Sequence, residues 1–556
     1  MARSFQRKVR SFPSGDQAGA AGEVPESAGR REAIRSTVSG SGSALAGDAV
    51  RTRRASRWRV LALGMRRCSG SAPALASARL VRSIGLVGLT ATGIASMVGA
   101  GIYVVPFMIQ RHVPGIGSGV LLAFLLAAVP AVLAGLAYAI LASAMPRAGG
   151  SYVYASRGLS PYLGFIASFS QWFSLCVAIG VVSYLLTPFV RDVALAGGAG
   201  EIARWLDGPA VRLLLPLAVL WLFAGVNLRG LGTYQRVLLP LLALTFLLGA
   251  VVIVAGFALG PGEVSPSAPT SAPAGPGTVA TAAALLFSSF IGFDAIAQAG
   301  GEARDPSRTL PLAIGLAIGI VTVFYALFAG AVYHAVPWTV VRDEALRHDT
   351  SAAALLGARL PGPLRVAVVA GAAVALVKDL PAMLLGVSRL MFAWAEDGIV
   401  PRAVASVHPR FHTPRVAIGV STAVASLGIL GCHLAGDFFL GVDILVTSML
   451  VNFLLICGSV LALPRRNPAL ASEIRVLRSP IAQRVIGVVG IVLLGALLVV
   501  HTARDLGSSG LPWYLRSTPV WLGVMAVGSA VYFRELRGLR QRGVDVRALF
   551  AALPPE

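Results

Sequence analysis

Uninterrupted apolar segments recur along almost the whole chain after residue 83, and this feature restricts the possible folds more than any other. Each segment approaches the ~20 residues that an α-helix needs to cross the hydrocarbon core of a bilayer. The 556 residues are 56% hydrophobic and 13% charged, and the mean hydropathy is +0.76. Soluble domains carry about 25% charged residues. We therefore interpret the chain as an all-α polytopic membrane protein.

Twelve segments are candidate transmembrane helices, and the fourth is the shortest. They are residues 83–108, 115–144, 161–189, 211–225, 237–259, 279–299, 310–333, 364–395, 416–434, 438–463, 481–501 and 519–533. The segments divide the chain into three parts: a basic N-terminal tail over residues 1–82, a transmembrane domain over 83–534 and a C-terminal tail over 535–556. No loop between them is long enough to contain a soluble catalytic domain.

The loops between these segments sort by charge. Arginines gather in alternate loops, which contain Arg147, Arg157, Arg229, Arg236, Arg304, Arg308, Arg402, Arg410, Arg415, Arg465, Arg466, Arg475, Arg478 and Arg484. The loop 261–278 contains neither lysine nor arginine. Because basic residues accumulate on the cytoplasmic side of membrane proteins, we expect a multi-pass protein of the plasma membrane with both termini in the cytoplasm.

The N-terminal tail is strongly basic. The formal net charge is +22, and about half of it precedes the first segment. The run RTRRASRWR (residues 51–59) could bind nucleic acid or anionic lipid. A disordered cytoplasmic tail accounts for the same composition, since the tail lacks apolar periodicity. An over-extended gene start is a third interpretation, because Met65 could begin a shorter chain. We favour the disordered tail and expect no nucleic-acid partner.

Two segments contain weak helix formers at mid-depth. The first includes MVGAGIYVVP, and Gly is about 1 kcal/mol less favourable than Ala inside a helix. The sixth includes SSFIGFD, five segments later. This spacing is typical of an inverted-repeat transporter with two discontinuous helices. The free N–H groups of a half-helix could then hold a carboxylate. Alternatively, Gly99 and Gly101 only permit close helix packing.

Four motifs resemble one family in order and spacing. They are GIASMVGAGIYVVP (93–106), NLRG (227–230), FIGFDAIAQAGGEARDPSRTLPLAI (290–314) and GVSRLMFAWAEDGIVP (386–401). They resemble the amino acid–polyamine–organocation superfamily of transporters. The resemblance implies about twelve helices, alternating access, and a five-plus-five inverted repeat with discontinuous helices 1 and 6. The first repeat would span residues 83–260 and the second 279–463, followed by two additional helices over 481–534.

The resemblance also implies a substrate site at the two interruptions. Amide groups of the first would hold the substrate carboxylate, at Gly99, Ala100 and Gly101, with Ser96 and Met97 just before them. Carbonyl groups of the sixth helix would hold the amino group and side chain, at Ser288, Ser289, Phe290, Ile291 and Gly292.

The sequence departs from the family at two of these places. Many relatives have Phe or Trp at the position of Ser288 as an occluding gate, so either Phe287 or Phe290 takes that role or the pocket is more open and polar. Some proton-coupled relatives have a lysine in the fifth span, where this chain has Thr245. A hydroxyl there could equally suit a cation site.

The eighth span contains two adjacent charges, Lys378 and Asp379. A charge deep in a span costs at least ~2.5 kcal/mol on insertion scales, so each needs a partner or a wet cavity. Because adjacent helical residues point about 100° apart, we expect each to face a different neighbour. Lys378 would approach Thr245 and supply an exchangeable positive charge, since a buried lysine can exchange a proton near neutral pH. The alternative is a structural ion pair with Asp294 or Asp443.

Further charges lie near the sixth and eighth spans. Asp294 could recognise a basic substrate, take part in ion coupling, or only cap the interruption. Candidate gate residues, with solvated surface charge as the alternative, are Glu302, Arg304, Asp305, Arg308, Arg389, Glu396 and Asp397.

The function that these observations favour is secondary active transport of an amino acid, by symport with H⁺ (or Na⁺) or by exchange. A polyamine or organic amine carrier is the alternative within the class. A channel or substrate sensor could share the fold without coupling. We expect no enzyme, cofactor or metal, since no intramembrane catalytic constellation or P-loop is present.

Overall fold

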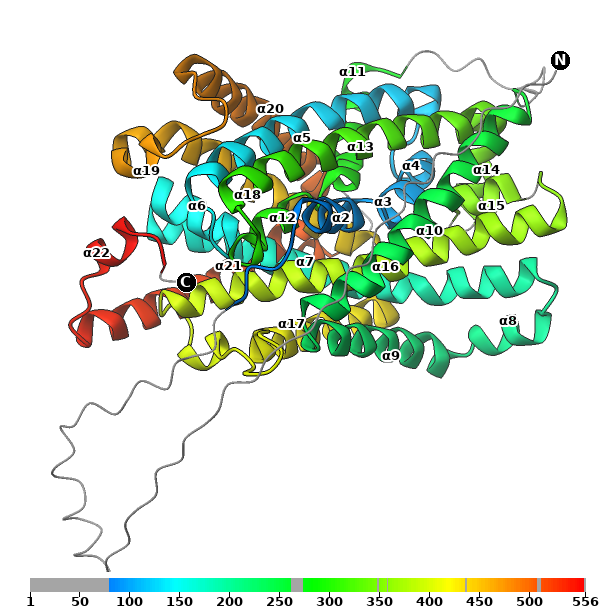
Figure 1. Ribbon diagram of the computed structural model, residues 1–556. Helices are drawn as coiled ribbons and strands as arrows, with labels where there is room; N and C mark the ends of the chain where they lie inside the picture. The colour runs from blue at the N-terminus through cyan, green and yellow to red at the C-terminus, as the bar shows by residue number, and fades with distance from the viewer. Residues whose placement is uncertain are drawn as a thin grey trace, which may run out of the picture. The chain divides into compact units, whose positions relative to one another are not determined.

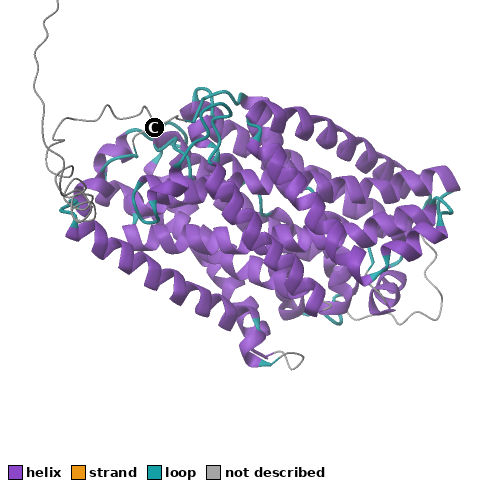
Figure 2. Ribbon diagram, turned by 90° about the horizontal axis from the view of Figure 1, so that it is seen from below, coloured by secondary structure: helices purple, strands orange, loops and turns teal. Residues whose placement is uncertain are grey.

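The computed structural model describes residues 80–261, 274–347, 350–357, 359–435, 438–507 and 512–554. Within these ranges the regular structure is helical, without a strand (Figure 2). Ten helical segments among them are long and apolar enough to cross a membrane. The all-α polytopic class is therefore confirmed. The predicted N-terminal tail lies almost wholly outside the described residues.

Ten of the twelve predicted spans coincide with these segments. Their helices are η1 (Gly117–Gly119) with α5 (Val120–Ala144), α7 (Pro161–Ala196), α9 (Pro209–Leu228), α10 (Leu231–Ala258), α11 (Pro276–Leu286) with η2 (Phe287–Phe290) and α12 (Asp294–Gln298), α13 (Pro306–Ala335), α16 (Gly362–Glu396), α17 (Arg415–Ala435), α18 (Phe439–Arg466) and α20 (Pro480–Gly507). The first predicted span is divided into α2 (Leu86–Met97), α3 (Ala100–Tyr103) and α4 (Val105–His112). The twelfth coincides with α21 (Ser517–Gln541).

Local sequence sets where several of these helices begin. Helices α7, α9, α11 and α13 each have proline in the first turn, where a missing N–H group costs nothing and the fixed φ suits the helix. Ser160 caps α7, because its hydroxyl accepts a hydrogen bond of 3.2 Å from Leu163 N.

Helix α7 lies at the centre of the bundle. It packs against α16, α17 and α18, while α5 packs against α13 (Figure 1). Helix α2 contacts α13, α16, α10 and α12. The interrupted first span is therefore enclosed by other helices, where its free backbone groups are kept away from lipid.

One end of the bundle collects the short helices α6 (Gly150–Gly158), α19 (Pro468–Ser472) and α22 (Val546–Ala551) (Figure 1). Asn467 Nδ2 donates to Ala551 O at 2.9 Å, and the guanidinium of Arg157 lies 5.0 Å from the Phe550 ring. We call this the arginine-rich end. The predicted tail boundary at residue 534 falls inside α21, and α22 folds back onto the bundle.

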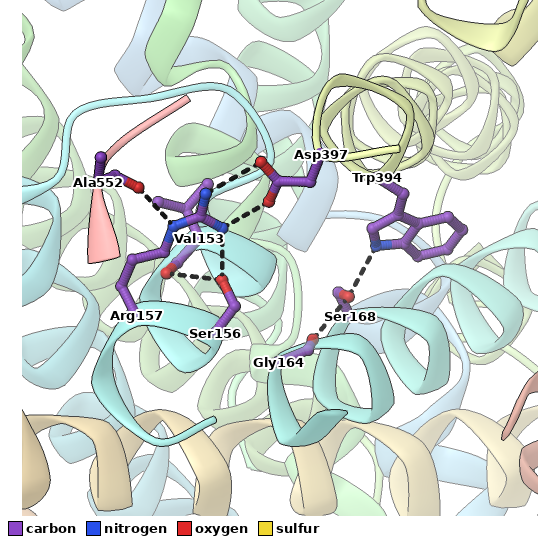
Figure 3. A network of polar contacts seen from close by, with 8 residues as sticks. All are labelled: Val153, Ser156, Arg157, Gly164, Ser168, Trp394, Asp397 and Ala552. Atoms are coloured by element: carbon purple, nitrogen blue, oxygen red, sulfur yellow. Dashed lines mark hydrogen bonds and ion pairs between the residues drawn. The ribbon is translucent and has the colours of Figure 1, made fainter. Parts of the chain in front are cut away.

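A buried ion pair holds α6 to the end of α16 there. Arg157 donates to both carboxylate oxygens of Asp397, at 2.6 and 3.0 Å, and its Nε donates to Ala552 O at 3.1 Å (Figure 3). The side chains of Arg157 and Asp397 are 0% and 1% exposed. Asp397 is therefore an anchoring residue, and the surface-charge alternative is wrong for it.

Asp397→Asn should lower the thermal midpoint of the detergent-purified protein markedly. The change leaves the Arg157 charge buried without its counter-charge, which costs about 3–5 kcal/mol in comparable cases. The matched control is Asp343→Asn, which breaks the Arg342–Asp343 pair, 36% and 51% exposed. That change should cost at most about 1 kcal/mol. Equal shifts for the two variants would contradict the structural role of the buried pair.

Candidate functional site

The first span is interrupted where the sequence predicts. Helix α2 ends at Met97, and Val98 is non-helical with φ −83° and ψ 88°. The chain becomes helical again at Ala100, and Gly99 O accepts hydrogen bonds from Ile102 N at 3.2 Å and Tyr103 N at 3.3 Å. The predicted interruption is therefore confirmed.

The two glycines of this span are also required by close neighbours. A Cβ atom on Gly99 would overlap the carboxylate of Asp379, and one on Gly101 would lie 2.9 Å from Ser289 Cα. The glycines thus both interrupt the helix and permit close packing, so the two interpretations from the sequence apply together.

The sixth span is interrupted in a matching way. Helix α11 gives way to η2, Ile291 is extended, and α12 begins at Asp294. Gly292 has φ +134°, which favours glycine, and a Cβ atom there would lie 2.5 Å from Ser96 O. Ser289 Oγ donates to Gly101 O at 2.6 Å. The two interruptions therefore contact each other directly.

A cavity lies between the interruptions and three intact helices. Six of the ten predicted substrate residues line it: Ser96, Met97, Gly101, Ser288, Ile291 and Gly292. Apolar side chains from α7, α16 and α18 form much of the remaining wall, among them Leu175, Val181, Val182, Met383, Val442 and Leu445. The cavity thus combines backbone and hydroxyl groups with an aliphatic surface.

The two candidate gate phenylalanines lie outside this wall. Phe290 packs against Phe124 and Tyr325, with ring centroids 5.0 and 5.6 Å apart. Phe287 packs against Phe453 at 5.9 Å. Ser288 itself faces the cavity. The wall therefore has a small polar side chain at this position.

Lys378 and Asp379 contact each other at the first interruption. Lys378 Nζ lies 2.5 Å from Asp379 Oδ1 and donates to Ala95 O at 3.0 Å and to Val98 O. Both side chains are buried, 0% and 5% exposed. Asp379 lines the cavity, with its carboxylate against Gly99. The pair thus connects α16 to the end of α2.

This arrangement corrects the expectation that the adjacent charges face different neighbours. The long, flexible stem of lysine crosses the angle between the two positions, so Lys378 reaches both the Asp379 carboxylate and the carbonyl groups of Ala95 and Val98. The alternative partners are also wrong: Asp443 pairs with Arg504 at 3.0 Å, and Asp294 accepts hydrogen bonds from other groups.

Asp294 is fully buried and lines the same cavity. It accepts hydrogen bonds from Gln171 Nε2 and, at 3.1 Å, from Gly292 N, so it does cap the interruption. No cation is paired with it among the described residues. Gln171 is not among the residues predicted from the sequence, and its one signal there is an uncharged amide in the middle of an apolar span.

Thr245 and the gate candidates lie away from the cavity. The Thr245 hydroxyl donates to Leu241 O of its own helix at 2.8 Å. Towards the arginine-rich end, Arg389 binds Glu302 through two hydrogen bonds, of 2.7 and 3.0 Å, and both side chains are 0% exposed. Glu302 O also accepts from Ser83 N and Ile84 N, each at 2.9 Å. The surface-charge alternative is wrong for this pair, whereas Arg304, Asp305 and Arg308 are exposed.

These features define the class of protein: a multi-pass membrane transporter in which two interrupted helices meet at a buried cavity. The chain belongs to the amino acid permease family, which matches residues 84–526. The resemblance to the amino acid–polyamine–organocation superfamily is thereby confirmed.

Curated relatives have transporter names. An uncharacterized transporter of Mycobacterium tuberculosis is 32% identical over 351 residues, which are 63% of this chain and 74% of the relative. A methylthioribose transporter of Bacillus subtilis is 26% identical, over 82% of this chain and 94% of the relative. A branched-chain amino acid permease of the same organism is 26% identical, over 70% and 83% respectively. The family and these names identify a transporter rather than an enzyme.

Gly99→Ala should destabilise the site by pushing the Asp379 carboxylate away from its place beside the interruption. Overpacking of this kind typically costs about 1–3 kcal/mol. The thermal midpoint of the purified protein measures the effect. Gly315→Ala is the matched control, because a Cβ atom there meets nothing within 4 Å. It should leave the midpoint unchanged or raise it slightly. A neutral Gly99→Ala would contradict the close contact.

Proposed function

We propose that the protein is a secondary active transporter of α-amino acids with neutral aliphatic side chains, working by alternating access and coupled to protons. The observation that carries this proposal is the composition of the cavity wall. Interrupted backbone lies on one side, at Met97, Gly101, Ile291 and Gly292, and aliphatic side chains lie on the other. An α-amino acid with an aliphatic side chain has the same two parts: polar amino and carboxylate groups at one end and an apolar side chain at the other.

The polar side of the cavity suggests an orientation for the substrate. Asp379 already lies against Gly99, so the substrate carboxylate would bind beside Gly101, at the N–H groups that begin the resumed helix before Ile102. The amino group would bind at the second interruption, near Asp294. An ammonium there would give this buried carboxylate the positive partner that it lacks among the described residues.

We further propose that Lys378 couples transport to protons. An ammonium group has three N–H donors, and Lys378 uses three acceptors: Ala95 O, Val98 O and Asp379 Oδ1. A neutral amine would lose the charge and one donor, and its hold on the end of α2 would weaken. The protonation state of Lys378 would then bias the position of the first span, as coupling requires.

A second candidate substrate class follows from Asp294. A buried carboxylate that faces the cavity without a cation also suits an organic amine or a basic amino acid. A relative named cationic amino acid transporter 4, of Homo sapiens, is 28% identical over 364 residues. The apolar wall favours the neutral substrate, because the other acidic residue that lines the cavity, Asp379, already pairs with Lys378.

A ligand panel tests the substrate proposal. Leucine, isoleucine and valine should raise the thermal midpoint of the purified protein, because ligand at 100 times its Kd stabilises by about 2.7 kcal/mol. The corresponding amines without a carboxylate are the matched ligands and should have little effect. Gly101→Leu should abolish the shift. Stabilisation by the amines alone would instead support the amine carrier and overturn the proposed carboxylate site.

Two substitutions test the coupling proposal in proteoliposomes. Lys378→Met removes the charge, and Lys378→Arg keeps a charge that cannot be released. Both should abolish the stimulation of uptake by an imposed pH gradient. Arg504→Met is the control, because it removes a membrane charge that pairs with Asp443 and does not line the cavity. Folded Lys378 variants that keep their pH-gradient response would overturn proton coupling through this lysine.

A further inference from the structure

A second cavity opens at the arginine-rich end, between α18, α19 and α20. Its volume is about 850 Å³, and its wall includes Arg465, Arg478 and Arg484. These arginines come from three segments: the last turn of α18, the loop after α19 and the first turns of α20. We call this cavity the arginine cleft. It is separate from the proposed substrate site, with which it shares no lining residue.

Among the described residues, no acidic side chain balances the positive charge of the arginine cleft. Within the described ranges, no ion pair or hydrogen bond joins Arg465, Arg478 or Arg484 to an acidic side chain. Glu473 is the acidic residue of this loop, and it lies 3.9 Å from Arg475 instead. Three guanidinium groups that face one cavity without a counter-charge make a site for an anion.

The loop that carries Arg478 is held in a defined shape. Leu477 has φ +51°, a conformation that is unfavourable for a side chain of this size. Gln483, which is 9% exposed, donates from Nε2 to Leu477 O at 3.0 Å and keeps the loop against α20. The backbone next to Arg478 is therefore held against α20 before any ligand binds.

An apolar stripe on α20 begins beside the arginine cleft. Ile481, Val485 and Val488 are 72%, 53% and 51% exposed and lie on one face of the helix, at positions i, i+4 and i+7. In a membrane-spanning helix such a face meets acyl chains. The ligand that fits both surfaces has an anionic head at the level of the arginines and hydrocarbon along this stripe.

We propose that the arginine cleft binds the phosphodiester head group of an anionic phospholipid, such as phosphatidylglycerol or cardiolipin. The planar guanidinium group matches phosphate oxygens with two parallel hydrogen bonds. Basic pockets between membrane helices at the interface attract anionic lipids in general. A soluble phosphate shares the head-group chemistry but gains nothing from the apolar stripe, so the lipid is the occupant that uses both surfaces.

The test uses the full chain, purified in a zwitterionic detergent and depleted of lipid. Phosphatidylglycerol and phosphatidylcholine with the same acyl chains are titrated separately, and glycerol phosphate is the soluble arm. Thermal midpoint gives the apparent affinity, and native mass spectrometry counts the lipids retained. The variant carries Arg465→Gln, Arg478→Gln and Arg484→Gln. The matched control carries Arg534→Gln, Arg537→Gln and Arg540→Gln, which remove the same charge from exposed positions of α21.

Phosphatidylglycerol should raise the midpoint and remain bound, whereas phosphatidylcholine and glycerol phosphate should have little effect. The arginine-cleft variant should bind phosphatidylglycerol roughly a hundredfold more weakly, as expected for three interfacial arginines. The control variant should bind it as the unmodified chain does. Equal effects of the two phospholipids, equal loss in both variants, or full stabilisation by glycerol phosphate would each overturn the proposal.

Discussion

The unpaired backbone at the two span interruptions is the constraint on which the rest of the site depends. A bilayer offers no water to free N–H and C=O groups, so an interrupted helix must find its partners within the protein. The interruptions supply some of these to each other, through the bond from Ser289 Oγ to Gly101 O. Lys378 supplies more by donating to Ala95 O and Val98 O. The cavity wall and the acceptors of the candidate coupling charge therefore lie at the same interruption, within residues 95–101.

Two buried ion pairs towards the arginine-rich end are a different kind of contact. The pairs Arg389–Glu302 and Arg157–Asp397 are fully buried and doubly hydrogen-bonded. Breaking a buried ion pair is costly when one of its charges remains out of contact with water. Under the proposed alternating access, water that enters as this end opens would hydrate both charges at once. Such pairs can therefore stabilise a state in which this end is closed and still allow the open state to form.

The sequence predicts the parts of this site that depend on local properties. Apolar length locates the spans, and weak helix formers locate the interruptions at Gly99 and Gly292, because each signal lies within one continuous stretch of sequence. Contacts between distant segments were not predictable in this way. The angle between Lys378 and Asp379 suggested separate neighbours, but the reach of the lysine stem and the carbonyl groups of α2 decide the outcome. The same holds for Gln171 beside Asp294 and for the docking of α22 through Phe550.

The choice of lysine at position 378 is informative in this chain. Of its 47 lysine and arginine residues, only Lys8 and Lys378 are lysines. Arginine therefore serves at almost every site that needs a permanent positive charge, including the buried pairs of the arginine-rich end. A guanidinium is planar and stays protonated, whereas an ammonium is compact, directs three donors to converging acceptors and can lose its proton. The position where the chain departs from arginine is the one where three acceptors surround a single nitrogen. The three converging acceptors favour lysine there. Under the proposed coupling, loss of its proton would weaken the hydrogen bonds that hold the end of α2.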